Sequence, residues 1–419
     1  MNIYLESIGC KLNQSEIEGV ARTLHHAGHR VVYDPVEADI CLFNSCAVTG
    51  IAAKKTRQAL RRLVRQNPAA EVVVMGCYGE LWPEQLSDIA GVRVLAGPDV
   101  KGNIVPALGI PAESALEEPL ARRRTRAFVK VQDGCNNHCT YCVVRIARGR
   151  ERSRPLDEIL REIEQLAGEG VQEIVLTGVH VGAYGHDLGL DLIGLARAIL
   201  DLGNVPRLRL SSIEPWHLQA RFLDLWDDRR LCRHLHLPLQ SGCDATLRRM
   251  GRRYTTEEFG MLVAQARARI PDLAITTDVM VGFPGETDAE FAESLRFVEC
   301  MEFSRLHVFR YSRRPGTVAA SLPDQVSGEI SSRRSNLMQE CGAILDRRFR
   351  KSVLGKTFPV LWETWDPATS CCSGLTDNYV RVVIESDENL HNQIRMVRLT
   401  HLKDGDAVSG ELAGGSELI

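Results

Sequence analysis

Short apolar runs alternate with helical patterns along the N-terminal part of the chain. Asn2 to Ile8 is predicted to form a strand, and the apolar residues between Ile17 and Leu24 follow it at the spacing of one helix face. The pattern returns in Asp39 to Phe43 and in Glu71 to Met75, which we expect to be strands on either side of a second helix. Alternating strands and helices are typical of a parallel sheet covered by helices. This part of the chain is therefore predicted to be a small α/β unit.

A second, larger set of strands follows a proline-containing segment between Gly97 and Arg126. Six apolar runs separated by helical patterns are predicted to be strands: Phe128 to Val131, Glu173 to Leu176, Arg207 to Leu210, His234 to Leu237, Ala274 to Val281 and Arg305 to Phe309. A complete barrel of eight βα units takes about 250 residues, and this segment is shorter. We therefore expect a partial (β/α)6 barrel of the TIM type, which starts near residue 123.

Strand alternation replaces the helical pattern near the C-terminal end. Glu329 to Lys351 has helical spacing and is predicted to be a long connecting helix. Phe358 to Glu363, Tyr379 to Glu385 and Arg395 to Leu399 alternate as strands and predict a small β-barrel. The predicted fold is thus α/β with three domains: an N-terminal parallel α/β domain (1–120), a central barrel (123–350) and a C-terminal β-barrel (352–419).

Length and composition agree with this division. The chain has 419 residues, of which 44% are hydrophobic and 25% are charged, so it can bury a large core and exceeds one ordinary domain. Its apolar runs are shorter than the roughly 20 residues that a membrane span needs. Met1 to Gly9 also lacks a basic leader with an apolar core. We expect a cytoplasmic protein without a membrane partner.

The 13 cysteines are the strongest chemical feature of the sequence. A reducing cytosol disfavours a disulfide framework, so clustered thiols point to metal or catalytic sulfur. Cys135, Cys139 and Cys142 form a Cys-x3-Cys-x2-Cys loop directly after the first predicted barrel strand. Three thiolates on one loop can ligate three irons of a 4Fe–4S cluster, which ordinarily takes four cysteines, so one iron is left open. A zinc knuckle of Cys139 and Cys142 with His138 or Cys135 is the alternative.

A second set of three cysteines belongs to the N-terminal domain. Cys10, Cys46 and Cys77 each follow a predicted strand, and the carboxyl ends of parallel strands line one edge of a sheet. We therefore expect the three thiols to meet there and to hold a second cluster. Three buried structural thiols are the alternative, because free cysteine is among the most buried residues.

The Cys-x3-Cys-x2-Cys loop at the head of a βα barrel resembles the radical S-adenosylmethionine (SAM) superfamily. The resemblance implies that SAM chelates the open iron of a catalytic cluster held by Cys135, Cys139 and Cys142. Other positions after successive strands are similar to the family's SAM contacts, in keeping with the active sites of βα barrels. These predicted cofactor-binding residues are Tyr141, Gly178, Ser211, Ser212, Glu214, Gln240, Gly282 and Gly285.

The two cysteine sets and the terminal β-barrel together resemble the methylthiotransferases. Gly9 to Gln14, Asn44 to Thr49 and Arg148 to Arg154 stand where that family has its motifs. Ser211 to Pro215 is most similar to the branch that adds a methylthio group to carbon 2 of N6-threonylcarbamoyladenosine at position 37 of tRNA. The resemblance implies two 4Fe–4S clusters, SAM, and a C-terminal barrel of the RNA-binding, OB-like TRAM type.

The implied reaction is a radical one. A reduced open-site cluster delivers one electron to SAM and yields a 5′-deoxyadenosyl radical, a sulfur held on the N-terminal cluster is inserted, and a second SAM supplies the methyl group. The implied partners are a tRNA anticodon loop, whose bases are exposed, and a single-electron donor such as a flavodoxin or ferredoxin. The sulfur donor stays unknown.

Other functions fit the same residues. The chemistry is also compatible with isopentenyladenosine at position 37 of tRNA or with a ribosomal protein side chain as substrate. An iron–sulfur protein that binds nucleic acid and senses redox state, without catalysis, is the alternative from another class.

The net charge of −3 is too small to indicate a partner, so the positions of the charged residues along the chain are more informative. Basic residues concentrate at 54–65, 122–130 and 145–154, which favours nucleic acid. From Ser352 onward, five basic residues face ten acidic ones. Because a threonylcarbamoyl group carries a carboxylate, a cation is expected near the active site, and Arg145, Arg148 and Arg310 are the predicted substrate-binding residues.

Overall fold

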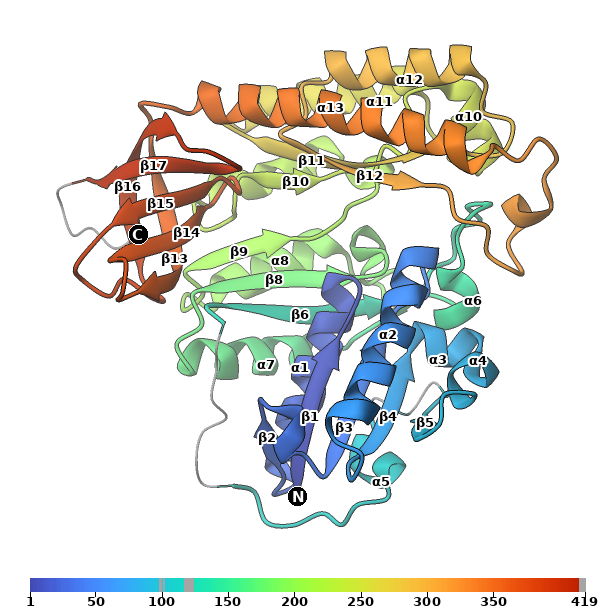
Figure 1. Ribbon diagram of the computed structural model, residues 1–419. Helices are drawn as coiled ribbons and strands as arrows, with labels where there is room; N and C mark the ends of the chain where they lie inside the picture. The colour runs from blue at the N-terminus through green and yellow to red at the C-terminus, as the bar shows by residue number, and fades with distance from the viewer. Residues whose placement is uncertain (98–99, 101, 117–123, 414–419) are drawn as a thin grey trace.

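The N-terminal domain is built on a five-stranded parallel sheet. The structure is a computed structural model that describes residues 1–97, 100, 102–116 and 124–413 (Figure 1). The strand order is β2-β1-β3-β4-β5. The elements are β1 (Asn2–Ser7), α1 (Lys11–His26), β2 (Arg30–Val32), η1 (Pro35–Glu37), β3 (Ile40–Ser45), α2 (Gly50–Gln66), β4 (Glu71–Gly76), α3 (Cys77–Leu81), α4 (Pro83–Ser87), β5 (Val92–Val94) and α5 (Ile104–Leu108).

Helices cover both faces of this sheet. Val20 and Leu24 of α1 pack with Ile3 on one face, whereas Leu60 of α2 packs with Phe43 on the other. The three predicted strands are confirmed as β1, β3 and β4. The sequence pattern did not predict β2 and β5, because strands of three residues are too short to show the alternation of apolar and polar residues.

The central domain is a curled sheet with six βα strands. One part has the strand order β7-β6-β8-β9 and the other β10-β11-β12, and isolated bridges from Leu208 to Leu231 and from Ser212 to His236 join them. The strands are β6 (Arg126–Asp133), β7 (Arg152–Ser153), β8 (Glu173–Gly178), β9 (Arg207–Leu210), β10 (His234–His236), β11 (Ala274–Val281) and β12 (Arg305–Arg310). The predicted partial barrel is therefore confirmed, while its proposed start near residue 123 lies outside the described residues.

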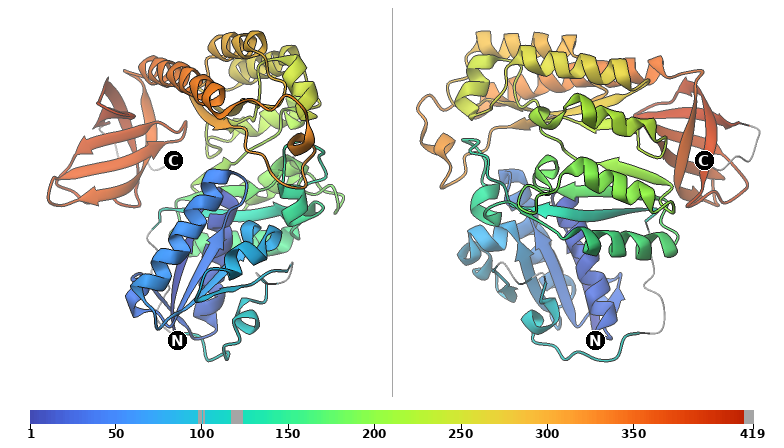
Figure 2. Two further views of the ribbon diagram at one scale, coloured as in Figure 1. Left: turned by 45° about the vertical axis from the view of Figure 1, so that its right-hand side comes forward. Right: turned by 180° about the vertical axis from the view of Figure 1, so that it is seen from behind.

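Helices pack on the outer face of the curled sheet (Figures 1 and 2). Ile159 and Ile163 of α7, for example, are buried in one core with Val129 and Val131 of β6. The helical elements are α6 (Val144–Arg148), α7 (Leu156–Gly168), η2 (Val181–Ala183), α8 (Leu192–Asp201), η3 (Pro215–His217), α9 (Ala220–Leu223), η4 (Asp224–Asp227), α10 (Asp244–Met250), α11 (Thr256–Arg269), α12 (Asp288–Cys300), η5 (Val318–Ser321) and α13 (Gly328–Ser352). The last is the predicted connecting helix, and none of the described helices combines the length and apolar character of a membrane span.

The C-terminal domain is a closed five-stranded barrel with the order β13-β14-β15-β17-β16. Its strands are β13 (Thr357–Asp366), β14 (Cys371–Thr376), β15 (Arg381–Glu385), β16 (Ile394–Leu402) and β17 (Ala407–Leu412). The three predicted strands correspond to β13, β15 and β16. The small residues of β14 hid it from the pattern: a Cβ at Gly374 would lie 2.4 Å from the carbonyl oxygen of Leu361, so close packing requires glycine there.

A buried charge network attaches this barrel to the amino-terminal ends of β8 and β9. Arg209 Nε donates to Glu173 Oε1 at 2.7 Å, and Arg209 Nη1 donates to the carbonyl oxygen of Asp377 at 2.9 Å. The ring of Tyr379 lies against the Arg209 guanidinium, 4.5 Å away. Burial alone would raise the pKa of Glu173, but Arg209 and Arg207 hold it below its usual value. Glu173 is therefore a buried carboxylate whose charge is compensated mainly by the arginines of this network.

Replacing Arg209 with methionine should destabilise the protein by about 3–5 kcal/mol, because it leaves the Glu173 carboxylate buried with less compensation. Urea unfolding of the purified chain measures the effect. Arg161→Met is the matched control, since its ion pair with Asp157 is exposed on both sides and is worth roughly 0.5 kcal/mol or less. Equal losses in the two variants would contradict the assignment.

Candidate functional site

The Cys-x3-Cys-x2-Cys loop begins directly after β6, at the carboxyl end of the strand. Gly134 has a φ of 69°, and a Cβ there would lie 2.0 Å from the carbonyl oxygen of Arg150. Cys135 N donates to the Gly149 carbonyl at 3.1 Å, and Thr140 N donates to the Met250 carbonyl at 2.9 Å. The loop is thus held between the ends of α6 and α10.

The thiols of this loop influence one another. The pKa of Cys142 is raised to about 12, mainly by burial and with a contribution from the neighbouring Cys139 and Cys135. Burial likewise raises the pKa of Cys135, and Cys139 adds to it. Thiols that disfavour each other's ionisation need a bound cation to become thiolates together, since a coordinating metal deprotonates its thiol ligand. The residues present therefore fit a metal cluster.

The two cysteine triads differ from a compact set of donors that would hold a single ion. Across the described residues, the one group of three donors with all ligand atoms within 4.8 Å is His236, Asp278 and His307. Neither cysteine triad, nor a zinc knuckle that includes His138, is gathered that closely. A 4Fe–4S cubane is larger than one ion and separates its ligands accordingly.

Arg252 connects the loop to the predicted SAM-binding residue Glu214. Its guanidinium donates to both carboxylate oxygens of Glu214, and Nη1 lies 3.6 Å from Cys139 Sγ. Burial opposes the charge of Arg252, yet Glu214 raises its pKa well above the usual value. No motif pointed to Arg252, because its partners are far away in the sequence.

Four more of the predicted cofactor-binding residues lie at the carboxyl ends of β8, β9 and β10. No described residue bonds the buried hydroxyl of Ser211, which leaves it available to a ligand. Ser212 pairs with His236, and Gln240 adopts a φ of 66° while its N–H donates to the Asp278 carbonyl at 2.8 Å. At Gly178 a Cβ would lie 2.9 Å from the Gln132 carbonyl, so glycine is needed for packing.

The remaining three predicted residues pack against protein. The Tyr141 ring meets Phe283 edge to face with centroids 6.4 Å apart. A Cβ at Gly282 would lie 2.2 Å from Ser331 Oγ of α13, and Gly285 faces Arg249. The N-terminus of α12 carries a capping box formed by Thr287 and Glu290, so its N–H groups are partly satisfied within the chain. Contact of these residues with SAM stays a prediction.

A pair of histidines that the sequence did not reveal lies beside the loop. His180 Nε2 and His217 Nε2 are 2.9 Å apart, and Asn137 of the loop lies 3.5 Å from His180 Nδ1. Burial lowers the pKa of each imidazole to about 4. Both are therefore neutral near pH 7, and one donates the hydrogen bond that the other accepts.

The second cysteine triad lies at the carboxyl ends of β1, β3 and β4, as the topology predicts. Cys10 precedes α1, Cys46 follows β3 and Cys77 begins α3. Burial raises the pKa of Cys46 to about 11, and the neighbouring Cys10 and Cys77 contribute. A Cβ at Gly9, whose φ is 126°, would lie 2.8 Å from Cys46 Cβ. The three thiols are thus neighbours, whereas Cys41 is buried in the sheet.

Arg148 joins this triad to the barrel. Its Nε donates to Cys77 Sγ at 3.2 Å and its Nη1 to Glu16 Oε1 at 2.7 Å and to Asp133 Oδ1 at 3.0 Å. Nη2 donates to Asn13 and Glu16. All five N–H groups are used, and the side chain is 5% exposed. The charge of this predicted substrate residue is therefore already balanced by protein carboxylates.

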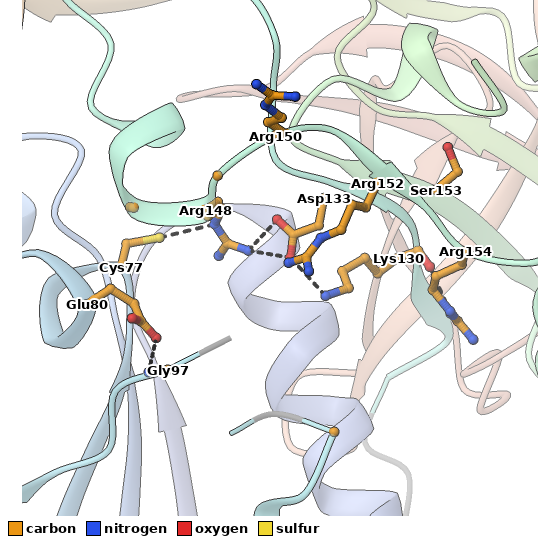
Figure 3. Close-up of a pocket in the computed structure, with 13 residues that line it drawn as sticks. Cys77, Glu80, Gly97, Lys130, Asp133, Arg148, Arg150, Arg152, Ser153 and Arg154 are labelled. Carbon is orange, nitrogen blue, oxygen red and sulfur yellow. Dashed lines mark hydrogen bonds and ion pairs between the residues drawn. The ribbon is translucent and has the colours of Figure 1, made fainter. Parts of the chain in front are cut away.

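A cavity of about 630 Å³ opens beside Cys77 and Arg148. Figure 3 shows Arg148 between Cys77 and Asp133 at its wall. The lining is mainly cationic, with two acids, Glu80 and Asp133, against Lys130, Arg148, Arg150, Arg152 and Arg154. Such a lining favours an anionic ligand.

The other two predicted substrate residues are exposed. Arg145 lies in α6, and its Nη1 is 2.6 Å from His138 Nδ1. Arg310 ends β12 and donates to Ser332 Oγ at 2.7 Å. Of the three predicted arginines, Arg148 alone has a side chain enclosed by protein groups.

Two family models match the chain. Residues 129–298 match the radical SAM superfamily, and residues 2–97 match "uncharacterized protein family UPF0004". Among solved structures, the radical SAM methyltransferase TsrM of Kitasatospora setae, with cobalamin and a [4Fe-4S] cluster bound, is similar with a TM-score of 0.57 and 17% identity. That match covers 76% of this chain and 77% of TsrM, and it supports the fold alone.

Curated relatives match nearly end to end. The threonylcarbamoyladenosine tRNA methylthiotransferase MtaB of Thermotoga maritima is 37% identical over 97% of this chain and 96% of its own length. The enzyme of that name from Bacillus subtilis is 34% identical, over 95% and 93%. The tRNA-2-methylthio-N(6)-dimethylallyladenosine synthase of Dictyoglomus thermophilum is 33% identical, over 96% and 96%. The chain therefore belongs to the radical SAM methylthiotransferase family, whose members use SAM and two 4Fe–4S clusters.

Proposed function

We propose that this chain methylthiolates carbon 2 of N6-threonylcarbamoyladenosine at position 37 of tRNA. The observation that carries the proposal is the presence of two cysteine triads, at the carboxyl ends of two sheets, in a chain similar from end to end to relatives named for that activity. A single-electron donor such as a flavodoxin or ferredoxin is required, and the anticodon loop is the part of tRNA that such a site can reach.

In this proposal each triad holds one cluster. Cys135, Cys139 and Cys142 leave one iron free for SAM, and Cys10, Cys46 and Cys77 leave one free for sulfur. When bound, the clusters and SAM supply the one-electron chemistry that activates a C–H bond, together with the sulfur and the methyl group. The chain itself holds the cysteines in place and orients Glu214 through Arg252. Through Arg148 it holds the two triads at a fixed position relative to each other.

The cationic cavity beside Cys77 supports an RNA substrate, because phosphate contacts dominate nucleic-acid affinity. In the C-terminal barrel, basic residues are outnumbered by acidic ones, ten to five. Lys356 pairs with Asp272, Arg381 with Glu363 and Arg395 with Glu388. In the cavity lining, Lys130, Arg148 and Arg154 are themselves paired with carboxylates. We therefore assign the main phosphate contacts to Arg150 and Arg152.

Removing each triad separately should abolish a different step of the reaction. Cys135, Cys139 and Cys142 changed together to alanine should halve the iron from about eight per chain and abolish SAM cleavage. The same change at Cys10, Cys46 and Cys77 should also halve the iron but leave 5′-deoxyadenosine formation without thiolated product. Iron analysis and nucleoside mass spectrometry measure both. Normal methylthiolation by the second variant would make the N-terminal triad structural.

The substrate branch is tested with tRNA carrying threonylcarbamoyladenosine or isopentenyladenosine. Arg145→Met or Arg310→Met should weaken action on the first substrate by about 1.5–3 kcal/mol, the range for a charged hydrogen bond. Neither variant should affect the second, which has no carboxylate and serves as the control. Preference of the parent enzyme for isopentenyladenosine would refute the branch assignment.

Arg148→Met tests the link between the triads. The variant leaves Glu16 buried beside Asp133 without its guanidinium, so we expect a loss of about 3 kcal/mol in urea unfolding. Arg150→Met, an exposed change two residues away, should cost roughly 0.5 kcal/mol or less. If both variants unfold at the same urea concentration, Arg148 does not hold the domains together.

A further inference from the structure

Three polar side chains, none of them a cysteine, converge on the neighbouring strands β10, β11 and β12. His236 Nε2 lies 3.4 Å from Asp278 Oδ1, and His307 Nδ1 lies 3.3 Å from the same oxygen. The two imidazole rings are stacked, with centroids 5.4 Å apart and planes at 26°. Neighbouring parallel strands place all three groups, so their geometry is fixed by the sheet.

The two nitrogen–oxygen distances in this group are longer than those of ordinary ion pairs. A hydrogen bond between a cationic nitrogen and a carboxylate is about 2.7–2.9 Å long, and both contacts here are longer. Zinc binds imidazole nitrogen and carboxylate oxygen at about 2.0–2.2 Å with tetrahedral geometry, which puts neighbouring ligand atoms roughly 3.3–3.6 Å apart. The observed distances match the edges of such a tetrahedron.

The second nitrogen of His236 is also held in place. Its Nδ1 lies 2.9 Å from Thr276 Oγ1, which in turn lies 3.0 Å from His234 Nε2. Imidazoles that ligate metals are usually oriented in this way by a hydrogen bond at the other ring nitrogen. Thr276 thereby orients Nε2 of His236 toward Asp278.

One side of the group is open. The His236 side chain is nearly covered, whereas Asp278 and His307 are 25% and 48% exposed. Two imidazoles and one carboxylate with a free position form a donor set used by catalytic zinc and by non-haem iron. The free position would accept water or an anionic oxygen.

We propose that His236, Asp278 and His307 bind one divalent transition-metal ion, zinc in the first instance, inside the partial barrel. The ion would lie near the strand ends that carry the predicted SAM contacts, because His236 pairs with Ser212 and the Asp278 carbonyl accepts from Gln240. The site is chemically distinct from the cysteine sites, since its donors are nitrogen and oxygen.

The test uses the enzyme with both clusters reconstituted, so that the cysteines are occupied. It is incubated with zinc chloride and separated from excess metal, and zinc and iron are measured by mass spectrometry. We expect about one zinc per chain together with about eight irons. No zinc uptake, or zinc gained only as iron is lost, would overturn the proposal.

Variants assign the zinc to these residues. Asp278→Asn and His307→Gln should lose the zinc while they retain full iron, which also shows that they fold. Thr276→Val should bind zinc about 10–100-fold more weakly, as expected for a residue that orients a ligand. His401→Gln, an exposed change on the C-terminal barrel, is the control. Unchanged zinc in the Asp278 and His307 variants would overturn the proposal.

Discussion

The arrangement of the two cysteine triads depends on the hydrogen bonds and ion pairs that the Arg148 guanidinium makes. Arg148 lies six residues after Cys142 and bonds Cys77, Asn13, Glu16 and Asp133 at once. A buried charge is tolerated only when its donors and its counter-charges are all matched. Any shift of α1 against β6 would break several of these bonds together, so the N-terminal domain docks in one orientation, with α3 against α6.

The openness of the barrel explains why other domains must complete it. A sheet of six βα units does not close, and its inner side has polar groups such as Glu173, Arg209 and His234. Lys11 of α1 and Tyr379 of the C-terminal barrel cover these groups at the amino-terminal ends of the strands, with Lys11 Nζ 5.8 Å from the Tyr379 ring. The predicted SAM contacts follow the opposite, carboxyl ends of the strands.

The sequence predicted what depends on local pattern. The apolar pattern predicts β1, β3, β4, the six barrel strands and α13, but neither β14 nor β17. The cysteines are assigned to strand ends because βα topology places them there. Side-chain contacts between residues far apart in the sequence could not be predicted from local pattern. The charge of Arg148 indicated an anionic partner, but not that Glu16, 132 residues away, would fill that position. Arg252 and the His180–His217 pair gave no motif for the same reason.

The C-terminal barrel is packed against the central domain through buried contacts, and this constrains how it can bind RNA. Its loop from Thr376 to Val380 contributes backbone carbonyls to Arg207 and Arg209, and Tyr379 stacks on His234 with centroids 4.7 Å apart. Burial lowers the pKa of Lys11, although the nearby Tyr379 favours its charged form. Lys11 follows Cys10 directly, so one short path joins the barrel to the N-terminal triad. A rigid contact of this kind fixes the barrel's outer strands relative to both cysteine sites, and RNA bound there would be held at a set distance from the chemistry.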